Sequence, residues 1–337
     1  MSDAFVSLED VTLSYGQTVA VPKLNLNIRR GELIALLGPS GCGKTTSMRA
    51  IAGLLDPTAG RILIDGADVT RTPANKRGIG LVFQSYALFP HLSAFENVAF
   101  GLRLKRLPEA EIRTKAEAGM ATVGLTGFES RKPGEMSGGQ QQRLALARSL
   151  VMEPKVLLLD EPLSNLDARL RLEMRNELQR VQKDTGITMV FVTHDQSEAL
   201  ALADRIVLMK DGEIEQLGTP AELYAEPVTA FAAEFMGFEN IFRTEGAALV
   251  SDRGRLPLDF DAPAGLLAWR PSGVAVGDGR HKGQVVASSF AGGHREYVLD
   301  SPLGQIKAEA PIETPEFAIG ESVAFDLPQS TARPLAA

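Results

Sequence analysis

Apolar and polar positions alternate differently in successive parts of the chain. Between residues 6 and 65, short apolar runs broken by turns predict short strands, and a stronger strand at residues 32–37 leads directly into a glycine-rich turn. Residues 46–55 then have helical character and end before Asp56 and Pro57, a natural helix stop. This order predicts a strand, loop and helix unit.

Helical patterns dominate the next part of the chain. Residues 93–150 contain charged, helix-forming stretches such as 108–123, which begins with a proline, and they predict a mostly helical insertion. Two apolar strands at residues 156–159 and 189–192 follow, separated by the amphipathic stretch 168–183. A strand, helix and strand in this order predict a parallel sheet.

Beyond about residue 237 the pattern changes to glycine, proline and short β-branched runs. Five short strands are predicted there, at residues 266–269, 284–287, 297–299, 305–308 and 323–327. Their near-regular spacing predicts a small barrel or sandwich. We therefore expect two domains, residues 1–237 with a mixed sheet and residues 238–337 with an all-β fold.

Composition narrows the class of protein. With 44% hydrophobic and 23% charged residues, the 337-residue chain has the composition of an ordinary globular protein. A net charge of −7 argues against a surface built to hold nucleic acid, and the single Cys42 excludes a disulfide within the chain. No apolar run exceeds five residues, and the start lacks the order of a signal peptide. We expect a cytoplasmic protein that serves a membrane only through a partner.

The glycine-rich turn fits the phosphate-binding pattern of glycine, four residues, glycine, lysine, then serine or threonine. Such glycines let backbone N–H groups approach phosphate oxygens, and the helix that follows points its positive dipole end at the same place. Lys44 would neutralise the β and γ phosphates of a nucleotide, and Thr45 would bind Mg²⁺. A turn that only caps a helix is the alternative. The nucleotide-binding residues predicted here are Gly38, Pro39, Ser40, Gly41, Cys42, Gly43, Lys44, Thr45 and Thr46.

A second candidate is the apolar strand that ends in Asp160 and Glu161. The carboxylates emerge at the C-terminal end of the strand, where open α/β sheets bind ligands. Adjacent residues of an extended chain face opposite ways, so we expect different tasks: Asp160 holds Mg²⁺, and Glu161 orients or deprotonates the attacking water. Considered alone, a strand ending in two acids is equally consistent with a structural role.

A serine and two glycines precede a helical stretch at residues 141–152 and form a second anion-binding helix N-terminus, with a plain helix cap as the alternative. Together with the phosphate loop and the acidic strand, this stretch resembles the nucleotide-binding subunits of ATP-binding cassette (ABC) transporters. The resemblance covers about residues 5–236. Met136 stands where the family's signature usually has leucine, of similar volume. The signature residues are Ser137, Gly138, Gly139 and Gln140.

The resemblance implies roles for four further positions. Tyr15 corresponds to the aromatic residue that stacks on adenine, and Gln84 to the glutamine that touches Mg²⁺ and the attacking water. Asp167 lies in the loop, residues 164–167, through which two subunits sense one another. His194 corresponds to the histidine that contacts the γ-phosphate. An ordinary strand tyrosine and a structural histidine are the alternatives for the first and last of these positions.

The family also implies partners. Two ATPase subunits close head to tail, so the signature of each copy would bind the ATP held by Lys44 of the other, and a monomer would be nearly inactive. One phosphate loop, no spanning segment and a short helical subdomain, about residues 87–150, exclude the fused exporters, the tandem ATPases and the long coiled-coil class. What remains is a bacterial importer subunit on the cytoplasmic face of the inner membrane. It would bind two permease subunits and, indirectly, a periplasmic solute-binding protein.

Two segments bear on coupling and cargo. Residues 84–91 resemble the groove for a coupling helix of the permease, with Tyr86, Leu88 and Phe89 as its apolar lining; inward packing is the alternative. With residues 95–102 they look most like the polyamine group, so spermidine or putrescine is the favoured cargo, and ferric iron, phosphonate or sugar the alternatives.

The region beyond residue 237 resembles the OB-like accessory domain called TOBE, in which dimer contact or regulation is favoured over nucleic-acid binding. Two rival functions remain, an ABC ATPase acting on nucleic acid or ribosomes and a regulatory protein that binds ATP without hydrolysing it. Because Cys42 stands in the phosphate loop, we also expect a bulky thiol reagent to block ATP binding.

Overall fold

The computed structural model describes residues 4–335, and the chain divides into two compact units, Met1–Pro220 and Ala221–Ala337. The expected boundary at residue 237 therefore falls inside the second unit. The reason is that Arg270 binds the carbonyl oxygens of Tyr224 and Met236, so the short helices of this stretch are hydrogen-bonded to the β-strands of the second unit.

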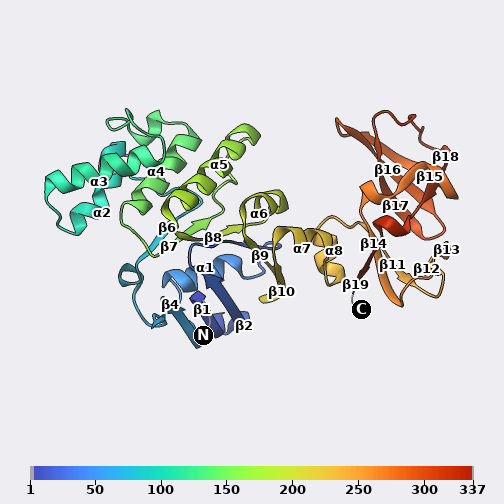
Figure 1. Ribbon diagram of the computed structural model, residues 1–337, viewed down its shortest axis with the longest axis horizontal. Helices are drawn as coiled ribbons and strands as arrows, with labels where there is room; N and C mark the ends of the chain where they lie inside the picture. The colour runs from blue at the N-terminus through green and yellow to red at the C-terminus, as the bar shows by residue number, and fades with distance from the viewer. Residues whose placement is uncertain (1–3, 336–337) are drawn as a thin grey trace. The chain divides into compact units, whose positions relative to one another are not determined.

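A six-stranded sheet forms the centre of the first unit, in the order β10-β9-β3-β8-β7-β6 (Figure 1). All its neighbours are parallel except β10, which runs antiparallel to β9. The predicted strands at residues 32–37, 156–159 and 189–192 are confirmed, as is their parallel arrangement. The strands are β3 (Leu33–Leu37), β6 (Ile79–Val82), β7 (Val156–Asp160), β8 (Thr188–Thr193), β9 (Arg205–Lys210) and β10 (Glu213–Gly218).

A second, antiparallel sheet of the first unit has the order β2-β1-β4-β5. Its strands are β1 (Ala4–Tyr15), β2 (Thr18–Arg29), β4 (Ala59–Ile64) and β5 (Ala67–Asp68). The prediction of short strands is wrong here, because β1 and β2 each run for 12 residues. Several register shifts along their pairing interrupt the apolar alternation, and in the sequence these shifts look like strand ends. Side chains of both sheets and of the helix after β3 share one core.

The described part of the first unit contains the α-helices α1 (Lys44–Ala52), α2 (Ala94–Leu104), α3 (Glu109–Thr122), α4 (Gly138–Leu150), α5 (Ala168–Thr185) and α6 (Gln196–Leu202). Helices α2, α3 and α4 pack on one another and form the expected helical subdomain, coloured cyan to green in Figure 1. Helix α1 ends at Ala52 rather than at residue 55, because Gly53 takes a left-handed conformation, φ 76°, and caps it.

The second unit contains two antiparallel sheets, β13-β12-β11-β14-β19 and β17-β16-β15-β18. They enclose one core that includes the fully buried Trp269, Tyr297 and Phe325. All five predicted strands are present, whereas four strands of three to five residues, β11, β12, β13 and β19, were not predicted. The elements are α7 (Pro220–Ala225), α8 (Ala230–Phe235), β11 (Asn240–Thr244), β12 (Ala248–Val250), β13 (Arg255–Pro257), β14 (Gly265–Trp269), β15 (Ala275–Phe290), β16 (His294–Ser301), β17 (Gly304–Pro311), β18 (Ser322–Asp326) and β19 (Arg333–Leu335).

Among the described residues, no helix is both long and apolar enough to cross a membrane.

Candidate nucleotide-binding site

The glycine-rich turn joins β3, in the middle of the parallel sheet, to the first residue of α1. Two of its glycines are required by space. A Cβ atom on Gly38 would lie 2.3 Å from the carbonyl oxygen of Met209, and one on Gly43, φ 100°, would lie 2.8 Å from Val21. Close packing against Met209 and Val21 therefore fixes the loop at the N-terminal, positive end of α1.

Lys44 is buried under this loop. Its ammonium group donates to the carbonyl oxygens of Gly38 and Pro39, each at 2.7 Å. The lysine that is expected to bind phosphate is therefore hydrogen-bonded to the backbone of its own loop. Cys42 is also buried, only 3% exposed, with its Sγ 3.7 Å from the Lys44 Nζ. This burial argues against the expectation that a bulky thiol reagent blocks ATP binding, because the Cys42 side chain packs into the core.

Two carboxylates follow each other at the end of β7, but they do not alternate along an extended strand as expected. Asp160 is the last strand residue, whereas Glu161 has a left-handed backbone, φ 45°. Asp160 Oδ1 lies 3.4 Å from the hydroxyl oxygen of Thr45. Burial, and then the charge of Glu161, raises the pKa of Asp160 above its ordinary value.

Three separate segments meet at Glu161. Its Oε2 accepts a hydrogen bond from the Gln84 amide at 3.2 Å, and its Oε1 lies 3.3 Å from His194 Nδ1. The Gln84 amide also donates to Ser164 Oγ, while Asn165 donates to the Gln84 carbonyl oxygen at 2.9 Å. The structure thus brings together Glu161, predicted from the acidic end of its strand, with Gln84 and His194, which the family resemblance singled out from distant parts of the sequence.

The signature residues begin α4. Ser137 and Gln140 form a reciprocal capping box, in which each backbone N–H donates to the other's side chain. Ser137, Gly139 and Gln140 line a hollow of about 140 Å³ with residues of α5, and no phosphate-loop residue contributes to it. The signature therefore lines a hollow of its own.

The remaining predicted residues have simpler surroundings. Tyr15, at the end of β1, is 48% exposed. Asp167 accepts a hydrogen bond from the Leu170 backbone at 2.9 Å and is the N-cap of α5, which is a structural task. Tyr86 is buried, which favours the alternative of inward packing for this residue, and Phe89 is partly covered by Phe100, with their ring centroids 4.6 Å apart.

Two residues of α4 at this site were missed in the sequence. Gln142 is buried, and its amide donates to the carbonyl oxygen of Pro162, the residue after Glu161, while its Oε1 has no partner among the described residues. Arg148 donates to two carbonyl oxygens just after Gln84. The available signal was weak: Gln142, Ala145 and Ser149 fall on one face of the helix, so a glutamine stands at a core-facing position.

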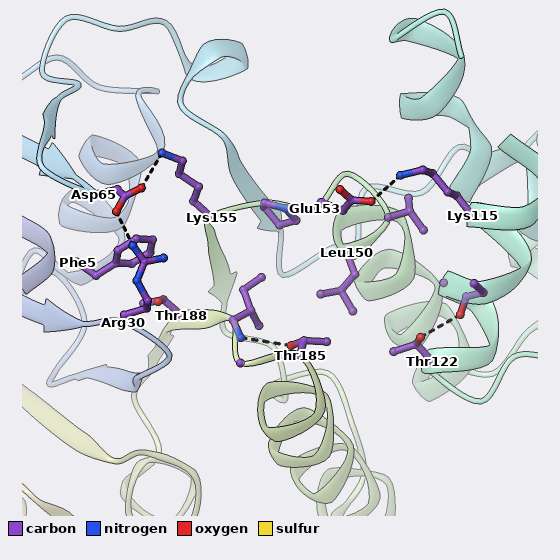
Figure 2. Close-up of a pocket in the computed structure, with 16 residues that line it drawn as sticks. Phe5, Arg30, Asp65, Lys115, Thr122, Leu150, Glu153, Lys155, Thr185 and Thr188 are labelled. Carbon is purple, nitrogen blue, oxygen red and sulfur yellow. Dashed lines mark hydrogen bonds and ion pairs between the residues drawn. The ribbon is translucent and has the colours of Figure 1, made fainter. Parts of the chain in front are cut away.

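A hollow of about 550 Å³ lies at the N-terminal ends of strands β7 and β8 (Figure 2). Thr188, the first residue of β8, is part of its lining, whereas the candidate site lies where these strands end. Its charged side chains are already paired, Arg30 with Asp65, Lys155 with Asp65, and Lys115 with Glu153. This hollow is therefore separate from the nucleotide site.

A largely parallel sheet with a phosphate loop after β3 and acidic residues at the end of β7, one strand removed from β3, defines a P-loop ATPase of the ATP-binding cassette type. The family model described as "ABC transporter" matches residues 21–164. The "Fe(3+) ions import ATP-binding protein FbpC" of Rhizobium etli is 50% identical over 97% of this chain and 93% of its own length. The "Spermidine/putrescine import ATP-binding protein PotA" of Acidothermus cellulolyticus is 51% identical over 77% of this chain and 72% of its own.

Solved structures of ATP-binding cassette proteins also match this chain. The structure of cbiO1 from Clostridium perfringens, part of an ABC transporter complex, matches with TM-score 0.63 and 36% identity over 67% of this chain and 92% of that chain. The ATP-binding cassette MJ0796, solved as a dimer bound to ADP and Pi, matches with TM-score 0.57 and 35% identity over 64% of this chain and 98% of its own. The chain belongs to the ABC transporter family: it is the ATP-binding subunit of an importer and couples ATP hydrolysis to transport.

Proposed function

We propose that the phosphate loop, residues 38–45, binds ATP with Mg²⁺, and that Glu161 activates the water that attacks the γ-phosphate. The observation that carries this proposal is the meeting of Gln84, Glu161 and His194 at one carboxylate. Tyr15, being exposed, is free to stack on the adenine, and Thr46, in the first turn of α1, lies beside the phosphates.

The residues present fit Mg²⁺. Thr45 and Asp160 offer hard oxygen ligands 3.4 Å apart, and Gln84 adds an amide oxygen nearby. Burial, and then the charge of Glu161, raises the pKa of Asp160, and a cation bound beside Asp160 would favour its charged form. Among the described residues, no three acidic, histidine or cysteine side chains are arranged to hold a metal ion by themselves, so the ion would take its other ligands from phosphate and water. Bound there, Mg²⁺ would neutralise charge that develops on the phosphates.

The residues of the site then divide the tasks of phosphoryl transfer among them. Lys44 exchanges its two loop carbonyls for phosphate oxygens and, with the loop N–H groups, holds the nucleotide. Glu161 accepts a proton from water as the water oxygen bonds to the γ-phosphorus and the bond to the β-phosphate oxygen breaks. Gln84 and His194 hold the Glu161 carboxylate in place and sense the γ-phosphate.

We further propose a head-to-tail dimer, in which Ser137, Gly138, Gly139 and Gln140 complete the site of a second copy. Support comes from the hollow that Ser137, Gly139 and Gln140 line with residues of α5 and with no phosphate-loop residue of the same chain, because the signature then offers a surface to a second copy. Asp167 then acts at the dimer interface as well as capping α5. The dimer would bind two permease subunits at the cytoplasmic face of the bacterial inner membrane, with a periplasmic solute-binding protein as indirect partner.

Ferric iron is the cargo that we propose. Support comes from the relative named as an Fe(3+) importer subunit, whose similarity extends over 97% of this chain and so includes the second unit. The polyamine preference drawn from residues 84–91 and 95–102 is weaker, because the relative named for spermidine and putrescine matches over only 77%. Polyamine remains the second candidate on the strength of that match.

Uptake by cells distinguishes the two cargoes. In the source bacterium, deletion of this gene should reduce uptake of radioactive ferric iron, and the intact gene should restore it while the Glu161→Gln variant should not. Uptake of radioactive putrescine should stay at the wild-type level. The opposite pattern would transfer the assignment to polyamines, and ATPase stimulation by DNA or RNA would favour a function on nucleic acid instead.

A further inference from the structure

A half-buried arginine holds the chain reversal that follows Gln84. The guanidinium group of Arg148, on α4, donates to the carbonyl oxygens of Tyr86 at 2.9 Å and Ala87 at 2.7 Å. Its central carbon also lies 5.6 Å from the ring centroid of Phe89. All three partners belong to one short segment, which lies between β6 and α2.

This segment has a strained backbone. Tyr86 has φ 61° and Ala87 has φ 47°, so two successive residues with side chains are left-handed. That conformation brings Cβ close to the following carbonyl oxygen and persists only where surrounding contacts impose it. Arg148 binds the carbonyl groups of these same two residues, and it is therefore the contact that can impose the strain.

A general contribution to stability does not explain Arg148. Burial lowers its pKa, and within residues 4–335 no carboxylate lies within ion-pair distance of its side chain. A half-buried cation whose partners are neutral carbonyl groups is less well stabilised than the same cation in water or paired with an acid. The feature that its hydrogen bonds specify is the path of the backbone.

The path matters because Gln84 lies in the same turn. The Tyr86 backbone N–H donates to the carbonyl oxygen of Phe83 at 2.8 Å, so residues 83–86 form one closed turn with Gln84 inside it. From this turn the Gln84 amide reaches Glu161. If Tyr86 and Ala87 relaxed to ordinary dihedral angles, the turn would open and Gln84 would leave its position.

We propose that Arg148 is a positioning residue for ATP hydrolysis: by imposing the left-handed conformation of Tyr86 and Ala87, it directs Gln84 at Glu161. This rests on the proposed function of Gln84 and Glu161 in hydrolysis. Arg148 touches neither nucleotide nor water in this scheme and acts only through the turn.

Steady-state ATP hydrolysis by the full chain tests the proposal. Arg148→Met, which keeps a long apolar stem, should lower kcat by about 10- to 100-fold, the effect of a misplaced catalytic group. The KM for ATP should stay within about threefold, because the phosphate loop is untouched. Arg148→Lys retains the charge but not the two-pronged donor, and should fall between the two proteins. If Arg148→Met does not fold, Arg148→Lys alone tests the proposal by the same measurement of kcat. Arg113→Met, at an exposed arginine of α3, is the matched control and should leave kcat unchanged.

A rescue separates positioning from a merely structural role. Glycine adopts a left-handed backbone without strain, so Ala87→Gly lets the turn form with less help from Arg148. Added to Arg148→Lys or Arg148→Met, it should raise kcat by at least about threefold. Ala110→Gly, at an exposed α3 position, should not. Amide exchange of residues 84–89 should rise in the single variants and fall again on rescue.

Wild-type kcat in Arg148→Met, or a double variant no faster than its parent, would overturn the proposal. Gln84→Ala keeps this failure apart from that of the proposed function. If Gln84→Ala hydrolyses ATP at the wild-type rate, the hydrolysis site itself is wrongly assigned. If Gln84→Ala is slow and Arg148→Met is not, only the role of Arg148 falls.

Discussion

The Gln84 side-chain amide donates to the Glu161 carboxylate at 3.2 Å, although 77 positions separate the two residues in the chain. The contact joins the loop after β6 to the loop after β7, and these strands are parallel neighbours. Because both loops leave the same edge of the sheet, a movement of one changes the surroundings of the other. The proposed water-activating group is thereby linked to the segment that leads into the helical subdomain.

Removing the charge of Glu161 should stop turnover without preventing ATP binding. Glu161→Gln keeps the shape and can still contact Gln84, but it cannot accept a proton from water, so kcat should fall by about 10²- to 10⁴-fold. With ATP bound and not hydrolysed, the dimer should accumulate and elute earlier in size-exclusion chromatography. Lys44→Ala is the control that should neither bind ATP nor dimerise. Turnover at the wild-type rate in Glu161→Gln would show that another group is the base.

Glu198 makes the stability of the first unit depend on pH. Its carboxylate is buried and accepts a hydrogen bond from Thr193 at 2.6 Å. Burial, followed by the charge of Asp195, raises the pKa of Glu198, although Thr193, Arg171 and His194 oppose the shift. A raised native pKa favours the protonated form, so its stabilising effect is complete below the pKa of the unfolded chain and is lost as the pH rises through the native value.

Glu198→Gln should remove this dependence, since an uncharged amide oxygen can still accept the hydrogen bond from Thr193. We expect the variant to have a higher Tm than the wild type at pH 8 and a difference that shrinks towards pH 4. Glu177→Gln, at an α5 glutamate that is paired with Arg180, is the comparison and should show no such gain at pH 8. A constant Tm difference across this range would contradict the assignment of the pH effect to Glu198.

Trp269 is the single tryptophan of the chain and is fully buried in the second unit, where its indole N–H donates to the Pro328 carbonyl oxygen at 2.9 Å. Its fluorescence therefore follows the unfolding of that unit alone. Leu299→Ala removes a fully buried side chain from the same core and should lower the free energy of unfolding by about 2–5 kcal/mol. Urea titration followed by tryptophan fluorescence measures it, and the affinity for ATP should not change. An unchanged midpoint would mean that Leu299 is not part of the core.

Cys42 should be protected from a bulky aromatic disulfide reagent in the native protein. Its side chain is 3% exposed and packs below the phosphate loop, so the reagent has no approach. One thiol should react promptly in denaturant, and native protein should react slowly both with and without ATP. Rapid native modification that ATP prevents would show that the loop opens widely in solution.

The sequence was sufficient for features that depend on local pattern. The phosphate loop, the strands of the parallel sheet and helices such as α5 follow from apolar periodicity and from glycine spacing, which act over a few residues. The backbone of Glu161 could not be predicted, because its left-handed conformation is imposed by a hydrogen bond from its N–H to Val192 on a neighbouring strand. Likewise, the burial of Tyr86 depends on a reversal held by a side chain 62 residues further along the chain. Such contacts exist only after the strands and helices have assembled.

Lys44 has a further consequence. Its ammonium group is already satisfied by two carbonyl oxygens of its own loop, so a nucleotide must replace these hydrogen bonds before the lysine can reach phosphate. Poor ligands such as inorganic phosphate or short anions offer too little in exchange, whereas a triphosphate offers several contacts at once. The hydrogen bonds of Lys44 to its own loop therefore favour a ligand with several phosphate groups over a single small anion.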